Sequence, residues 1–167
     1  MVTSQQFWWR FFPQRELTQI YIANALRSFS ISVVGIFIPL YLYAELGYSL
    51  QETLLFFIFY SVLFAIMTPL AAKFAARYGV KHSVLLSVPC YLSFIGLLYA
   101  LPFVETPLLL ISSLLGASQA FYWMGTHLLF HHASDRQHRG SAIGLRGSIN
   151  VLAGMAGPLL GGALILY

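Results

Sequence analysis

Long apolar stretches alternate with short polar segments along the whole chain. A helix needs about 20 mostly apolar residues to cross a bilayer. Five stretches meet this requirement: residues 17–43, 54–72, 84–101, 108–130 and 146–167. Membrane-crossing strands would alternate apolar and polar positions, and these stretches do not. The pattern predicts an all-α, polytopic transmembrane helix bundle of five spans, with residues 17–167 as the membrane domain and residues 1–16 as a cytoplasmic or interfacial segment.

The composition agrees with a membrane protein. Hydrophobic residues make up 59% of the chain and charged residues 8%, against roughly 25% charged residues in a soluble domain. This excludes an ordinary soluble protein and makes the lipid bilayer the first expected partner. The net charge of +4 comes from scattered residues, so we expect no nucleic-acid partner.

Basic residues fall in alternate polar segments, and the segments between them contain glutamates but no lysine or arginine. The basic segments hold Arg10 and Arg15; Lys73, Arg77, Lys81 and His82; and Arg136, Arg139 and Arg146. Positively charged loops face the cytoplasm in most membrane proteins. We therefore expect a cytoplasmic N-terminus and a location in the plasma (cytoplasmic) membrane.

Polar residues within the apolar stretches are the candidates for a substrate pathway, because such residues are costly in a bilayer. They are Asn24, Arg27, Gln119, Trp123 and His127. Arg27 either lines a cavity or extends its guanidinium to the headgroups, and the remaining side chains either line a cavity or pack against neighbouring helices. His127 and His131 share a helix face, but two ligands are weak evidence for zinc, and we expect no metal.

Enzymatic chemistry has little support in the sequence. No nucleophile lies at a recognisable spacing from a base and an orienting acid, and no glycine-rich loop is built to hold phosphate. We expect a protein that is not an enzyme and needs no cofactor.

The segment between the second and third stretches carries a first recognisable motif. Arg77, Gly79 and Lys81 lie at the positions of an arginine, a glycine and a basic residue in a loop signature of the major facilitator superfamily, which the chain resembles here. Ala76 replaces the acidic residue of that signature, and Ala72 replaces its leading glycine. The resemblance implies an inner gate at this loop.

The fifth stretch is similar to a second signature, that of the fifth helix in the superfamily's drug–proton antiporters. The matching positions are Gly144, Ala153, Gly157, Pro158, Gly161 and Gly162, with alanine for glycine at 153. Gly147, Asn150, Gly154, Gly157 and Gly161 also fall within one narrow arc of a helix, as in closely packed membrane helices. A third signature, an arginine followed by Gln-Gly in the fourth span, is missing, so the resemblance is weaker for the antiporters than for the superfamily.

The resemblance implies the N-terminal portion of a transporter with two six-helix halves, the second half being a missing part of the same polypeptide. Such a protein moves a small solute by alternating access, driven by an ion or solute gradient, and efflux of a drug or metabolite is one form of this activity. Two alternatives remain. One is a five-span scaffold or assembly subunit, and the other is a half-transporter that works as a homodimer.

Overall fold

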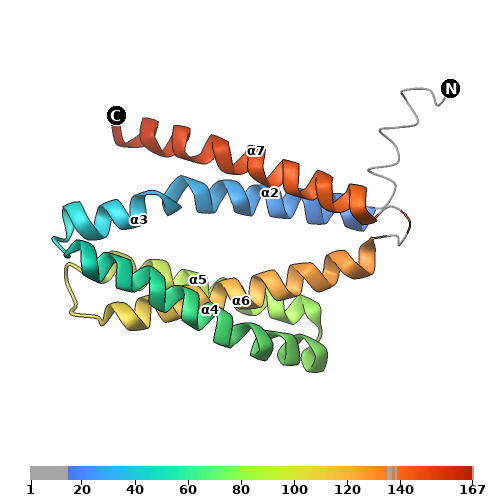
Figure 1. The fold of residues 1–167 in the computed structure, drawn as a ribbon, viewed down its shortest axis with the longest axis horizontal. Helices are drawn as coiled ribbons and strands as arrows, with labels where there is room; N and C mark the ends of the chain where they lie inside the picture. Colours follow the sequence, from blue (N-terminus) through green and yellow to red (C-terminus); the bar gives the residue numbers. More distant parts are fainter. Residues whose placement is uncertain (1–14, 135–136, 138, 167) are drawn as a thin grey trace. The chain divides into compact units, whose positions relative to one another are not determined.

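The computed structural model describes residues 15–134, 137 and 139–166, and every regular element in this part of the chain is helical (Figure 1). The helices are α2 (Arg15–Gly35), α3 (Phe37–Leu40), the π-helix η1 (Tyr41–Glu45), α4 (Leu50–Tyr78), α5 (Val80–Ala100), α6 (Leu108–Ala133) and α7 (Arg139–Leu166). The predicted all-α architecture is confirmed. Residues 1–14, which make up most of the predicted interfacial segment, lie outside the described residues.

Among the described residues, five helical segments are long and apolar enough to cross a membrane, as predicted. They run over Leu17–Glu45, Leu50–Tyr78, Val80–Ala100, Leu108–Ala133 and Arg139–Ala163. Helical structure therefore continues beyond several of the apolar stretches. The largest difference is in the last span, whose helix begins at Arg139 rather than Arg146.

Local signals set the ends of α4. Ser49 and Glu52 form a capping box, in which the Ser49 backbone N–H donates to the Glu52 carboxylate at 2.8 Å and the Glu52 N–H donates to the Ser49 hydroxyl at 3.2 Å. This pairing satisfies backbone donors that the first turn leaves without partners. Gly79 ends the helix with φ of 94°, a conformation that glycine adopts without steric cost.

The first span is interrupted near its end. Proline lacks a backbone N–H and its ring collides with the carbonyl four residues earlier. For Pro39 that residue is Gly35, where α2 ends. The chain continues through α3 into the π-helix η1, and the Leu46 N–H donates to the Tyr41 carbonyl at 3.0 Å.

The chain divides into two compact units. The α2–α7 unit comprises residues 1–40 and 130–167, and the α4–α6 unit comprises residues 41–129. Each unit is described by itself below.

In the α2–α7 unit, the two long helices run side by side in the same direction (Figure 1). Near their beginnings, the Tyr21 hydroxyl donates to the Ala142 carbonyl at 3.4 Å. Further along, α7 passes so close to α2 that a Cβ at Gly161 would lie 2.7 Å from the Val33 carbonyl oxygen. Glycine permits this contact between helix backbones, as in other membrane helix pairs.

In the α4–α6 unit, buried serines join α5 to α6. The Ser83 hydroxyl donates to the Phe121 carbonyl at 3.0 Å, and the Ser118 hydroxyl donates to the Ser87 carbonyl at 2.9 Å. On the other side of α6, a Cβ at Gly116 would lie 2.9 Å from the Tyr60 carbonyl oxygen of α4. Hydrogen bonds and small residues thus hold these three apolar helices in a fixed register.

Candidate functional site

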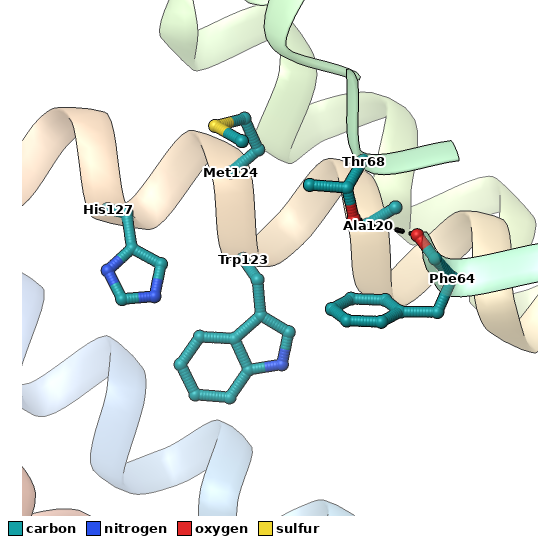
Figure 2. A pocket seen from close by; sticks show the side chains of 6 residues that line it. All are labelled: Phe64, Thr68, Ala120, Trp123, Met124 and His127. Atoms are coloured by element: carbon teal, nitrogen blue, oxygen red, sulfur yellow. Dashed lines mark hydrogen bonds between the residues drawn. The ribbon is translucent and has the colours of Figure 1, made fainter. Parts of the chain in front are cut away.

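A pocket of about 390 Å³ lies between α4 and α6 (Figure 2). Phe64 and Thr68 line it from α4, and Ala120, Trp123, Met124 and His127 line it from α6. The spacing of three and four residues places each set on one face of its helix. Both helices are candidate membrane spans, so the pocket opens within the membrane domain.

Aromatic rings dominate the geometry of the pocket. The Trp123 and His127 rings are stacked, with their centroids 5.6 Å apart and an angle of 29° between their planes. Figure 2 shows both rings on the same side of α6. On α4, the ring of Phe64 is stacked with that of Tyr60 at a centroid distance of 6.4 Å. Thr68 donates its hydroxyl proton to the Phe64 carbonyl at 2.7 Å, so its oxygen remains able to accept a hydrogen bond.

The structure brings together two of the five residues predicted for the substrate pathway, Trp123 and His127. Gln119 is also on α6 and is 7% exposed, but it does not line this pocket. Asn24 is buried and Arg27 is half-buried on α2, which belongs to the other unit. The sequence did not single out Phe64 and Thr68, because their contribution depends on the packing of α4 against α6.

Arg146 is a buried cation that the sequence analysis placed at the very start of the last span, with the basic residues that precede it. It is 6% exposed, and its guanidinium carbon lies 5.2 Å from the centroid of the Phe130 ring. Because α7 begins at Arg139, Arg146 lies two turns into the helix, about 10 Å from its start. A cation over an aromatic face is stabilised by the ring's quadrupole. One sequence signal could have indicated this burial: Arg146 lies at helical spacing from Asn150, Gly157 and Gly161, on the face of the helix that carries the small residues.

The inner-loop motif forms the tight connection between α4 and α5. Gly79 provides the turn, and its N–H donates to the Ala75 carbonyl at 3.0 Å. Arg77 lies 5.4 Å from the Tyr78 ring centroid and is exposed, as is Lys81. The carboxylates of the α4–α6 unit, Glu45, Glu52 and Glu105, lie at the other ends of its helices.

The glycines of the fifth-helix motif differ in their surroundings. Gly157 and Gly161 are buried against α2. A Cβ at Gly144 or Gly162 would meet nothing within 4 Å. Pro158 is inside the continuous helix α7 and is half-buried, like Ala153. Within the predicted arc, Gly147 and Gly154 likewise have open space beside them.

His131 contacts Arg139, the first residue of α7. At the end of α6 its ring nitrogen Nε2 lies 3.2 Å from a guanidinium nitrogen of Arg139, which also donates to the Ser134 hydroxyl at 3.1 Å. Arg139 thereby ties the end of α6 to the start of α7. Among the described residues, no group of three or more His, Cys, Asp or Glu side chains is placed to hold a metal ion.

The helices, with their length and apolar character, define an all-α protein built from helices that are able to cross a membrane. The family model of the Major Facilitator Superfamily matches residues 20–167, and the chain belongs to this family. The predicted family resemblance is therefore confirmed, and family membership points to a transporter rather than an enzyme. No curated relative and no solved structure matches the chain.

Proposed function

We propose that the protein moves a small solute by alternating access, driven by an ion or solute gradient, and that the α4–α6 pocket is part of the substrate pathway. The pocket is the observation that carries this proposal. Its volume lies within the range of small-molecule sites, which are mostly apolar with a few polar groups. Trp123 and His127 are such polar residues of the lining, and both lie on a helix that is long and apolar enough to cross a membrane.

The close packing of α2 against α7 bears on how these two helices move during the proposed transport cycle. The contacts at Gly157 and Gly161 join the two backbones without intervening side chains. We propose that α2 and α7 move as one body because of these contacts. The interruption of the first span between Gly35 and Pro39 is then the flexible point, since helix hydrogen bonds are missing there.

We also propose a plasma-membrane location with a cytoplasmic N-terminus. The cations Lys73, Arg77 and Lys81 at the α4–α5 connection support this orientation, as does Arg139 at the start of α7. From the family resemblance we further propose that the solute is a drug or metabolite that leaves the cell. We also propose that a second half of the same polypeptide completes the transporter.

A transport assay tests the proposal without a known substrate. Proteoliposomes receive a defined mixture of amino acids, sugars, nucleosides, aromatic amides and quaternary ammonium dyes, with and without a pH gradient. Trapped solutes are measured by mass spectrometry against protein-free liposomes. We expect at least one solute to accumulate, and Ala120→Leu, which enlarges a fully buried residue of the pocket lining, to abolish this accumulation.

The control variant is Phe103→Leu, which changes a 78% exposed residue outside the pocket and should leave uptake unchanged. Retention of folding by Ala120→Leu is checked by its helical circular dichroism and its elution volume. No accumulation of any solute, with or without the pH gradient, would favour the five-span scaffold. Unchanged uptake by folded Ala120→Leu would remove the pocket from the pathway.

A further inference from the structure

The geometry of the α4–α6 pocket points to an uncharged, planar aromatic solute with one hydrogen-bonding group as its ligand. This inference rests on the proposed function, because it takes the pocket as a substrate site. It is carried by three features: the stacked pair of Trp123 and His127, the ring of Phe64 on the facing helix, and a lining without a fixed charge.

The stacked pair determines where an aromatic ring can lie. Two aromatic layers need about 7 Å between the outer rings if a third ring is to fit, because carbon atoms pack at about 3.5 Å. The Trp123 and His127 centroids are 5.6 Å apart. A solute ring therefore does not insert between them. It lies against the exposed part of the indole, which is 37% exposed and borders the pocket with Phe64.

The facing helix contributes the second aromatic surface. The Phe64 ring lies 6.4 Å from that of Tyr60, one turn earlier on the same helix, and it borders the pocket. Figure 2 shows Phe64 and Trp123 bordering the same space from two helices. Offset or edge-to-face contacts with both rings favour a flat aromatic solute over an aliphatic one of equal size. Met124 adds a polarizable sulfur, which also favours aromatic partners.

The lining opposes charged solutes. None of the six lining residues is a lysine, arginine, aspartate or glutamate. A charged group that leaves water without an opposite charge is strongly disfavoured. The Thr68 hydroxyl donates within its own helix and its oxygen can still accept, so one amide or hydroxyl donor on the solute can be satisfied.

The volume limits the size of the solute. A cavity on the order of 150 Å³ holds benzene. The pocket is about 390 Å³, which is sufficient for one or two rings with a short substituent. We therefore expect molecules of the size of a substituted benzamide, and not large polycyclic compounds.

Trp123 itself can report on binding. The sequence contains three tryptophans, and the double variant Trp8→Phe/Trp9→Phe leaves Trp123 alone. In nanodiscs of this protein, 4-nitrobenzamide should quench Trp123 fluorescence saturably. Benzamide should displace it, whereas cyclohexanecarboxamide, benzoate and benzyltrimethylammonium should each compete at least tenfold less effectively.

Variants connect the effect to the pocket. Phe64→Leu removes one aromatic surface and should weaken 4-nitrobenzamide binding about threefold to tenfold. Phe103→Leu, the matched change at an exposed position outside the pocket, should leave binding unchanged. Equal competition by benzamide and cyclohexanecarboxamide would overturn the inference, because it would show an apolar groove that also accepts lipid chains. Stronger competition by either charged probe would overturn it as well.

The outcomes separate this inference from the proposed function. Uptake of other solutes by proteoliposomes, without specific competition by benzamide, would refute the aromatic substrate class and leave the transporter standing. Specific binding of benzamide without transport of any solute would support the aromatic site and refute the transporter.

Discussion

Replacing Gly157 with alanine should drive α2 and α7 apart. The new Cβ would collide with the Ser32 hydroxyl oxygen, and it would lie 2.7 Å from the Val33 nitrogen and 2.8 Å from the Ser32 carbonyl carbon. The hydroxyl can rotate away, but the two backbone atoms move only with their helix. Overpacking of this kind costs about 1–3 kcal/mol, and the better helix propensity of alanine returns up to about 1 kcal/mol.

We therefore expect Gly157→Ala to lower the free energy of unfolding by about 1–2 kcal/mol. Equilibrium unfolding in mixed micelles, followed by circular dichroism, measures this change. The matched control is Gly154→Ala, where a Cβ meets nothing within 4 Å and stability should stay equal or rise. Adding Ser32→Ala to Gly157→Ala should restore only part of the loss, because the backbone contacts remain. Equal stability of Gly157→Ala and Gly154→Ala would refute the close packing of the two helices.

Three further predictions concern single contacts. Gly79→Ala places a side chain at φ of 94° and ψ of 150°, a region that only glycine adopts readily, and should lower the free energy of unfolding by about 1–3 kcal/mol in the same assay. The helical Gly96→Ala should cost nothing; equal effects of the two changes would contradict this. Ser118→Ala removes the hydrogen bond to the Ser87 carbonyl and should lower the free energy of unfolding by roughly 0.6 kcal/mol. Its control, Ser61→Ala, changes an exposed serine that donates to the Phe57 carbonyl of its own helix, and stability should stay nearly the same. A larger loss for Ser61→Ala than for Ser118→Ala would argue against the α5–α6 link. Arg139→Lys keeps the charge but loses the planar guanidinium that contacts Ser134 and His131. The backbone amides at the end of α6 should then exchange their hydrogens with solvent faster. Unchanged exchange rates would contradict the role of Arg139 at this helix end.

The sequence predicted the helices better than their contacts. Apolar length identified each span, and the Ser49–Glu52 capping box and Gly79 are local signals that need no knowledge of neighbouring helices. Helical spacing also predicted a small-residue face on α7. It did not distinguish Gly157, which meets α2, from Gly154, which has open space beside it. That difference depends on the crossing of two helices, which no single helix encodes.

The candidate site was predictable only in part, because it too depends on how two helices pack together. Trp123 and His127 were identified because polar side chains within a span are costly in a bilayer. Phe64 is one of many phenylalanines in the chain, and only the packing of α4 against α6 places it at the pocket. Arg146 was expected at the very start of the last span, with the basic residues that precede it, because the helix was expected to begin where the apolar stretch begins. The helix starts two turns earlier, and the cation is buried beside Phe130.

Access to Thr68 from both sides of the membrane tests the central claim most directly. The single cysteine, Cys90, is replaced by serine, and Thr68→Cys is added in the pocket. A membrane-impermeant methanethiosulfonate is then applied to either side of sealed proteoliposomes, with and without a pH gradient. The control is Val104→Cys, at a 57% exposed position in the connection between α5 and α6, which should be labelled from one side only and should not respond to the gradient. A transporter with alternating access predicts labelling of Thr68→Cys from both sides, in a ratio that the gradient changes; labelling from one side alone, whatever the gradient, would contradict the account.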